Sequence, residues 1–188
     1  IFNSTTLTAT ITQFGASGDR PIPNDFDGDG RADIAVFRPS DGVWYEQRSL
    51  GSQFFAQQFG ANGDIPQVFD YDGDGIADLC VYRPGGGEWH FFQSSNSTYV
   101  AFPFGTFGDK PVPADFDGDG RTDVAVFRAT ADANLPDFYI LTSGTFNYYG
   151  LSWGVPGDIP VVADYDGDGK ADTGIFRPSN QTWYLLRS

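Results

Sequence analysis

Short apolar stretches separated by polar turns run along the whole chain. The segments 34–38 "IAVFR", 43–49 "VWYEQRS" and 54–59 "FFAQQF" are rich in Val, Phe, Tyr and Trp, and clusters of Gly, Pro, Asp and Ser lie between them. No segment has the periodicity of an amphipathic helix, whereas short runs of this composition bounded by turn residues are typical of β-strands. The pattern therefore predicts an all-β protein.

The same arrangement of strands and turns occurs four times. The motif "DFDGDGRAD" at residue 25 recurs in similar form at residues 70, 115 and 164, so that the copies start 45, 45 and 49 residues apart. Each unit holds about four strands, which is the content of one propeller blade. We predict a single domain with the fold of a four-bladed antiparallel β-propeller. Its blades span 15–59, 60–104, 105–153 and 154–188.

The two ends of the chain indicate how the ring closes. The last unit, 154–188, stops after its third strand. Residues 1–14 contain "TLTATITQF", which has the alternating pattern of the missing fourth strand and ends at the same Phe-Gly junction. We expect residues 1–14 to complete the fourth blade. The third unit has four extra residues between Arg128 and Phe138, which predict a longer hairpin loop.

The recurring acidic motif has the spacing of a calcium-binding loop. Calcium takes six to eight oxygen ligands, and alternate side chains of a tightly curled loop converge on one point. In each copy the first, third, fifth and ninth residues are Asp, and the carbonyl group of the seventh is a further expected ligand. The predicted ligands are Asp25, Asp27, Asp29, Arg31 and Asp33; Asp70, Asp72, Asp74, Ile76 and Asp78; Asp115, Asp117, Asp119, Arg121 and Asp123; and Asp164, Asp166, Asp168, Lys170 and Asp172.

The residues after the motif distinguish it from an EF-hand. An EF-hand requires Glu at the twelfth position, where this chain has Val36, Val81, Val126 or Ile175. The loop therefore leads into a strand. About four calcium ions, one per blade, would change the net charge from −14 to about −6, whereas unmetallated acidic turns would repel one another. Magnesium fits less well because it prefers an octahedral site that retains water.

Units of the form "FGxxGDxPVPADFDGDGxxDxAVFRP" resemble FG-GAP or VCBS-type repeats. Such repeats are the calcium-loop blades of integrin alpha-subunit propellers and of many bacterial surface proteins. The resemblance covers nearly the whole chain and implies metal loops between the first and second strand of each blade. Integrin propellers have more blades than this chain. Closure of four blades within one chain, pairing of two chains into a larger ring, and membership of a longer propeller remain alternatives.

Other residues recur in every unit. An Arg follows the second strand and an Asp lies in the "GD" turn, at Arg38, Arg83, Arg128 and Arg177 and at Asp19, Asp64, Asp109 and Asp158. We expect ion pairs between blades or Arg stacking on Trp44, Trp89 and Trp183. The alternative is a ring of four arginines that faces an anionic ligand.

The single His and the single Cys both occupy repeated positions. His90 stands where other units have Tyr45, Tyr139 and Tyr184, so we interpret it as a variant of an aromatic position. Cys80 stands opposite small residues, which predicts a packed side chain. Since every conspicuous carboxylate belongs to a repeated loop and catalysis needs an unrepeated constellation, we predict no catalytic residues and no enzymatic activity.

Composition and charge restrict the partners and the compartment. A net charge of −14 makes nucleic acid and anionic membranes unfavourable partners, and no apolar run is long enough to insert into a membrane. The three N-x-[ST] triplets at Asn3, Asn96 and Asn180 are candidate glycosylation sites. Together with the calcium loops they favour a secreted or cell-surface location. The chain contains no Met, and we interpret it as a processed mature chain or a segment.

Two classes of function follow. In the first, the protein is a calcium-stabilised structural or adhesive module that contacts other copies of itself or other cell-surface proteins, with the N-terminal strand able to pair with a neighbour. In the second, it is a calcium-dependent lectin that binds glycans through exposed aromatic side chains. The candidate aromatic residues are Phe107, Tyr148, Tyr149 and Trp153.

Overall fold

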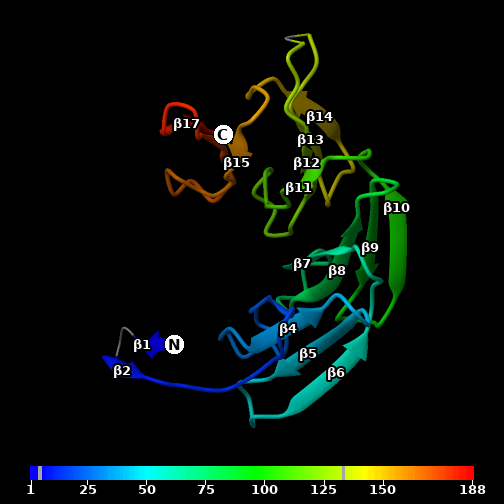
Figure 1. The fold of residues 1–188 in the computed structure, drawn as a ribbon, viewed down its shortest axis with the longest axis vertical. Helices are drawn as coiled ribbons and strands as arrows, with labels where there is room; N and C mark the ends of the chain where they lie inside the picture. Colours follow the sequence, from blue (N-terminus) through cyan, green and yellow to red (C-terminus); the bar gives the residue numbers. More distant parts are fainter. Residues whose placement is uncertain (4–5, 133) are drawn as a thin grey trace.

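The computed structural model describes residues 1–3, 6–132 and 134–188. These residues form 17 strands in five antiparallel sheets and contain no helix. Four sheets correspond to the four sequence repeats and are called blades 1 to 4 here; the all-β prediction is confirmed. Figure 1 shows the blades following one another along an open arc, with the N-terminal hairpin and the C-terminal blade at its two ends.

The strands of each blade follow the order of the sequence. Blade 1 contains β3 (Arg20–Pro21), β4 (Ile34–Arg38), β5 (Val43–Gln47) and β6 (Phe54–Gln58). Blade 2 contains β7 (Ile65–Phe69), β8 (Asp78–Arg83), β9 (Glu88–Phe92) and β10 (Tyr99–Pro103). Blade 3 contains β11 (Lys110–Pro111), β12 (Val124–Phe127), β13 (Phe138–Leu141) and β14 (Tyr148–Leu151). Blade 4 contains β15 (Ile159–Pro160), β16 (Thr173–Arg177) and β17 (Thr182–Leu186).

The acidic loops connect the first and second strands of each blade, as the sequence predicts. The second and third strands form a tight hairpin in which an aromatic pair lies side by side, for example Phe37 opposite Trp44 and Tyr82 opposite Trp89. In blade 3 the corresponding hairpin connection, 128–137, is longer. Its described residues, 128–132 and 134–137, project from the arc between β12 and β13 in Figure 1, which agrees with the predicted longer loop.

The hydrophobic core lies between blades rather than within one sheet. Its three clusters join blade 1 to blade 2, blade 2 to blade 3 and blade 3 to blade 4. At the first junction, Phe37 and Trp44 of blade 1 belong to the same cluster as Leu79 and Val81 of blade 2. Because each sheet is flat and thin, its apolar face is buried only when the next blade covers it. Each blade therefore depends on its neighbours.

The chain that leaves the fourth strand passes close to the hairpin between the second and third strands of the same blade. The indole Nε1 of Trp44 donates a hydrogen bond of 2.7 Å to the Phe59 carbonyl, and Trp89 donates one of 2.8 Å to Phe104. Gly42, which precedes β5, has φ of 68°, and a Cβ at this position would lie within 2.8 Å of the Gly60 carbonyl group. Only glycine fits this crossing without strain.

The N-terminal segment forms a hairpin of its own. Instead of forming the fourth strand of blade 4, Thr8–Ala9 (β2) pairs with Phe2–Asn3 (β1) in a separate two-stranded sheet. Blade 4 has three strands among the described residues. In the open arc the edge of β17 is not adjacent to the N-terminal segment, which therefore pairs locally. Ring closure by residues 1–14 stays a prediction.

Among the described residues, no helix has the length and hydropathy required to span a membrane.

Candidate metal centre

Each acidic loop folds around its first aspartate. The carboxylate of Asp25 accepts hydrogen bonds of 2.7 Å from the backbone N–H groups of Gly28 and Gly30. The same two bonds recur at Asp70, Asp115 and Asp164, with lengths between 2.6 and 3.0 Å. Both glycines have positive φ, 77° and 81°. The "DGDG" sequence is thus required for the curl of the loop, because glycine adopts this conformation without steric cost.

The ninth residue of each loop is a buried carboxylate that ties the loop to the rest of its blade. The exposed fraction of Asp33 is 1%, and it is 0% for Asp78, Asp123 and Asp172. One oxygen of Asp78 accepts a bond of 2.8 Å from the N–H of Tyr71, and the other accepts a bond of 2.7 Å from the N–H of Ser94. The equivalent bonds of the other loops measure between 2.6 and 2.9 Å.

Sequence reasoning missed the serine at the end of each third strand. Besides its N–H, the side chain of this serine bonds to the fifth aspartate in three blades: Ser49 to Asp29, Ser94 to Asp74 and Ser188 to Asp168, at 2.8 to 2.9 Å. The recurrence was visible in the repeat, since a serine lies two residues after each third strand, at Ser49, Ser94, Ser143 and Ser188. This serine orients two of the predicted ligands.

The carboxylates converge closely enough to share a cation. Oxygen atoms of the first and third aspartates, with the fifth in blade 1 and the ninth in the others, lie within 4.8 Å of one another. The four sets are Asp25, Asp27 and Asp29; Asp70, Asp72 and Asp78; Asp115, Asp117 and Asp123; and Asp164, Asp166 and Asp172. The donors are all oxygens, and three carboxylates at this spacing repel one another unless a cation lies between them. The residues therefore fit a hard divalent ion such as calcium. The fifth aspartates of the other loops and the carbonyl groups of Arg31, Ile76, Arg121 and Lys170 stay predicted ligands.

The environment of the ninth aspartate changes along the arc. Burial raises the pKa of Asp78 and Asp123 above the ordinary value of 3.8. The pKa of Asp172 is instead lowered, first by the hydrogen bond from the Ser188 N–H. Among the described residues no blade follows blade 4, so its carboxylate is less desolvated although its local bonds are the same.

The loops of blades 1 to 3 also contact the next blade. The N–H of Ala77 donates a bond of 2.8 Å to the Asp25 carbonyl, Thr122 bonds to Asp70 at 2.9 Å, and Ala171 bonds to Asp115 at 2.6 Å. The side chain of the seventh residue covers the fourth residue of the preceding loop, as Ile76 covers Gly28. A loop that is held rigid therefore also fixes the position of its neighbour.

Comparison with known proteins assigns these loops to a repeat family. The model of the FG-GAP-like repeat matches residues 25–81 and 70–126, so each match begins at the first aspartate of one loop and ends within the second strand of the next blade. The chain belongs to the FG-GAP-like repeat family. No curated protein is found to match it.

The arginines of these FG-GAP-like repeats form ion pairs within a blade, not between blades. Arg83 Nε and Nη2 each donate a bond of 2.9 Å to the Asp64 carboxylate, and the pair is repeated in every blade as Arg38 with Asp19, Arg128 with Asp109 and Arg177 with Asp158. The expected stacking on Trp is also wrong. Arg38, Arg128 and Arg177 lie over Tyr45, Tyr139 and Tyr184, at 4.4 to 4.6 Å from the ring centroids.

The stacking partner is a Tyr because the Trp of the hairpin points into the core. Trp44 and Trp89 are fully buried, whereas Tyr45 lies on the opposite face of the strand. His90 occupies the Tyr position in blade 2, as predicted, and its Nδ1 is 2.8 Å from the Tyr99 hydroxyl. Cys80 is buried in the core, which confirms its role as a packed side chain.

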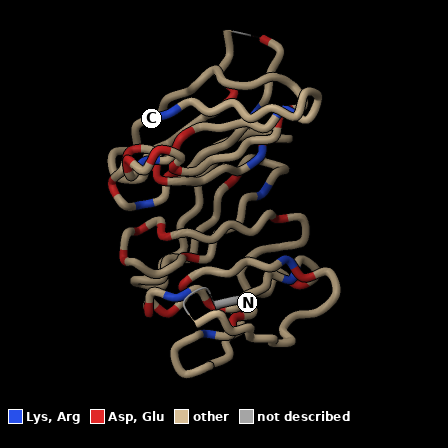
Figure 2. Tube along the Cα trace, turned by 90° about the vertical axis from the view of Figure 1, so that its left-hand side faces the viewer, with Lys and Arg blue, Asp and Glu red and all other residues tan. Residues whose placement is uncertain are grey.

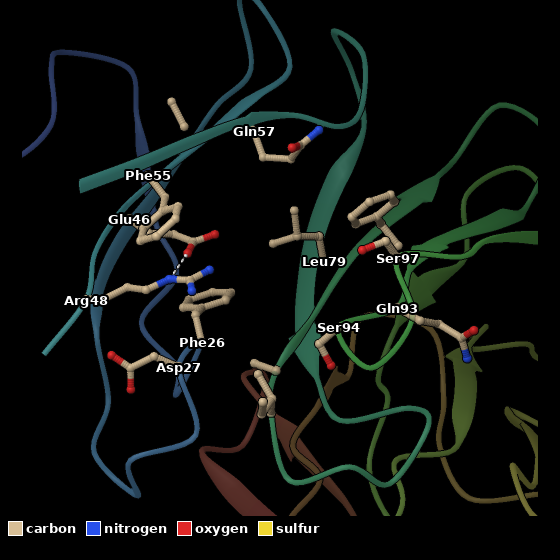
Figure 3. A pocket seen from close by; sticks show the side chains of 14 residues that line it. Phe26, Asp27, Glu46, Arg48, Phe55, Gln57, Leu79, Gln93, Ser94 and Ser97 are labelled. Carbon is tan, nitrogen blue, oxygen red and sulfur yellow. Dashed lines mark hydrogen bonds and ion pairs between the residues drawn. The ribbon is translucent and has the colours of Figure 1, made fainter. Parts of the chain in front are cut away.

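One charged pair is not repeated and lies in a hollow between blades 1 and 2. Glu46 is 3% exposed, and Arg48 Nε donates a bond of 3.0 Å to its carboxylate. The Arg48 guanidinium lies 3.9 Å from the centroid of the Phe55 ring. Figure 3 shows these side chains at one wall of the hollow, with Gln57 and Gln93 around its rim. Its volume is about 310 Å³, and burial raises the pKa of Glu46.

The predicted lectin and glycosylation residues differ in exposure. Phe107 and Tyr148 are 84% and 59% exposed, whereas Tyr149 and Trp153 pack against the cluster between blades 3 and 4. Asn96 and Asn180 are exposed and lie in turns. Ser4 and Thr5, which complete the triplet of Asn3, lie outside the described residues.

Figure 2 shows acidic residues at every level of the arc, as expected from one acidic loop per blade.

Proposed function

We propose that the protein is a non-catalytic, calcium-stabilised extracellular module that serves structural or adhesive contacts and associates with further copies of itself. The observation that carries this proposal is the position of the carboxylate clusters. Three of the four lie in a loop that also bonds to the next blade, so that a cation bound there stabilises a junction as well as a loop. Calcium would neutralise the carboxylates and fix the loops; the chain's own residues position them.

Membership of the FG-GAP-like repeat family supports an extracellular location, because such repeats are typical of extracellular proteins. Calcium is abundant outside cells, and carboxylate-rich loops suit that supply. The net charge of −14 also supports protein partners, because a negatively charged chain repels nucleic acid. Bound calcium would neutralise part of this charge and so reduce the repulsion between copies of the protein. In this proposal the blades form a propeller, and the partners are other copies or other surface proteins.

Calorimetric titration with calcium tests the metal sites. We expect about four ions per chain and a melting temperature that falls on chelation, because each ion at a hundred times its dissociation constant contributes about 2.7 kcal/mol. The variant Asp70→Asn should lose one site. Asp41→Asn is the matched control, since Asp41 is an exposed acid outside the clusters. A wild-type chain that binds no calcium, or an Asp70→Asn variant that binds as many ions as Asp41→Asn, would refute the assignment.

Carbohydrate binding is a second candidate, favoured by the hollow between blades 1 and 2. There an aromatic ring, a buried ion pair and amide side chains surround a space of about 310 Å³. Sugars bind to such mixed surfaces by stacking on rings and by hydrogen bonds. A glycan array probed in calcium should then show binding that Arg48→Ala removes and that Arg187→Ala leaves unchanged. An array without any bound glycan would exclude this candidate.

A further inference from the structure

Three junctions between neighbouring blades lie inside the molecule, and each is formed by two complementary faces. Blade 4 and blade 1, at the two ends of the arc, each present one of these two faces without its partner. In blades 1 to 3 the residue after the first loop aspartate is buried: Phe26, Tyr71 and Phe116 are 4 to 9% exposed. Its equivalent in blade 4, Tyr165, is 38% exposed. Trp183 is 56% exposed, although its equivalents Trp44 and Trp89 are fully buried. Blade 4 thus presents the face that precedes a junction, and its aromatic side chains are not covered.

Blade 1 presents the complementary face. Ala77 and Leu79 of blade 2, which pack against blade 1, are each 7% exposed. Their equivalents in blade 1 are Ala32, which is exposed, and Ile34, which is half-buried. A hollow of about 480 Å³ lies over this face, lined by Ala32, Ile34, Val36 and residues of the N-terminal segment. This is the volume that the side chains of a preceding blade would fill.

The N-terminal segment enters blade 1 as if a preceding blade were present. The ring of Phe14 contacts Phe54 edge-on at a centroid distance of 6.4 Å, in the way that Phe59 contacts Tyr99 and Phe104 contacts Tyr148, at 6.3 and 6.2 Å. Phe59 and Phe104 follow the fourth strands of blades 1 and 2. Phe14 therefore occupies the position that follows a fourth strand. The residue three before it, Ile11, is 97% exposed.

The repeat specifies how this segment would pair with β17. In blade 1, Gln58 pairs with Val43 and Gln57 with Trp44. By equivalence, Gln13 pairs with Thr182 and Thr12 with Trp183. The Trp183 indole would then donate to the Phe14 carbonyl, as Trp44 does to Phe59 at 2.7 Å. The N–H of Ala32 would reach the Asp164 carbonyl, which reproduces the bond between acidic loops at each internal junction.

The geometry points to a second copy of the chain as the occupant of both faces: blade 4 of one copy receives the N-terminal strand and blade 1 of the next. This inference rests on the self-association proposed above and adds its interface. The arc of Figure 1 does not bring its own ends together. Closing it would alter three junctions whose aromatic side chains are fully buried, and such close-packed contacts resist continuous deformation. A second copy completes both faces and leaves those junctions unchanged.

Gln181 makes this junction looser than those at which blades 1 and 2 have glycine. Gln181 precedes β17 with φ of 57°, where blades 1 and 2 have Gly42 and Gly87 with φ of 68° and 67°. A Cβ at either glycine would clash with backbone atoms of Gly60 or Gly105. In the intermolecular junction the Cβ of Gln181 would therefore press on Gly15 of the incoming strand. We expect Gln181→Gly to strengthen association.

Sedimentation velocity over a range of concentrations in calcium measures the association. Because the interface joins two different faces, both a closed ring of copies and a filament agree with it. Trp183→Ala should weaken association by roughly tenfold or more, as expected for a buried aromatic anchor, and Gln181→Gly should strengthen it. Phe107→Ala, an exposed aromatic outside both faces, is the control and should associate like the wild type.

Disulfide trapping then identifies the partner. A chain that carries both Gln13→Cys and Thr182→Cys should give covalently linked oligomers under oxidation, while a linked monomer would show closure within one chain and overturn the inference. Gln13→Cys with Phe107→Cys is the control and should not link. If copies associate in calcium but no trapping occurs and Trp183→Ala has no effect, self-association stands and this interface is wrong. If the protein is monomeric at every concentration, both proposals fail.

Discussion

The Arg83 side chain offers a direct measure of how much the repeated ion pairs stabilise a blade. Arg83→Ala removes both bonds of 2.9 Å to Asp64, whose side chain is 2% exposed. One acceptor bond from the Ala61 N–H, also 2.9 Å, remains. The substitution therefore leaves a carboxylate that is shielded from water and has lost its counterion.

The structure sets the size of the effect. Removing one partner of a fully buried pair costs about 3–5 kcal/mol. Arg83 is itself 39% exposed, so that water can enter the vacated space and part of the cost is recovered. We expect a loss of about 2–3 kcal/mol in the free energy of unfolding, near the value of a hydrogen-bonded charge. For a chain of this size this corresponds to a decrease of about 4–12 °C in melting temperature.

Thermal unfolding followed by Trp fluorescence in saturating calcium provides the assay. Arg187→Ala is the matched control, because Arg187 is 67% exposed and lies 3.9 Å from Asp166. Such a surface pair contributes less than about 0.5 kcal/mol. If Arg83→Ala unfolds within 2 °C of Arg187→Ala, the buried pair does not stabilise the blade and the reasoning is refuted.

Three further predictions concern single positions. Gly87→Ala should cost about 2–4 kcal/mol, since φ is 67° and its Cβ would meet the backbone of Gly105, whereas Gly85→Ala, with open space around it, should be neutral in urea unfolding. The Arg177 hydrogen bond lowers the pKa of Asp158, so its stabilisation is complete above the ordinary value of 3.8 and is lost as the pH falls further; Asp158→Asn should therefore flatten the decrease in melting temperature below pH 3.8. Equal slopes would contradict this. Cys80, whose pKa burial raises, should react with thiol reagents only after unfolding, and rapid labelling of the native protein would contradict its packing.

The repeat made most of the fold predictable. The strands, the position of the acidic loops and the long hairpin of blade 3 all follow from residues that recur at fixed offsets. The converging carboxylates also follow, because the spacing of the aspartates and the two glycines determines the local curl. These are properties of short segments, which the chain encodes within a few residues.

What the sequence did not indicate depends on the orientation of side chains across a strand. Arg38 was expected to stack on Trp, but alternate residues of β5 face opposite sides, so that Trp44 enters the core and Tyr45 remains beside the arginine. The role of Ser94 was missed because it lies 16 and 20 residues beyond the two aspartates that it contacts, and the spacing within the acidic motif does not reveal this contact. The curvature of the arc was also not predictable, since it depends on small angles at each junction.

The bond from the Ala77 N–H to the Asp25 carbonyl has an equivalent at each of the other two internal junctions, so that all three share one backbone contact. A repeat protein with uniform junctions has a stability that is approximately a sum over units and their nearest neighbours. Duplication or loss of one whole unit in the gene therefore leaves the same backbone bond available at the new junction. Chains of this kind can change length in steps of 45 to 49 residues during evolution without a new interface having to arise.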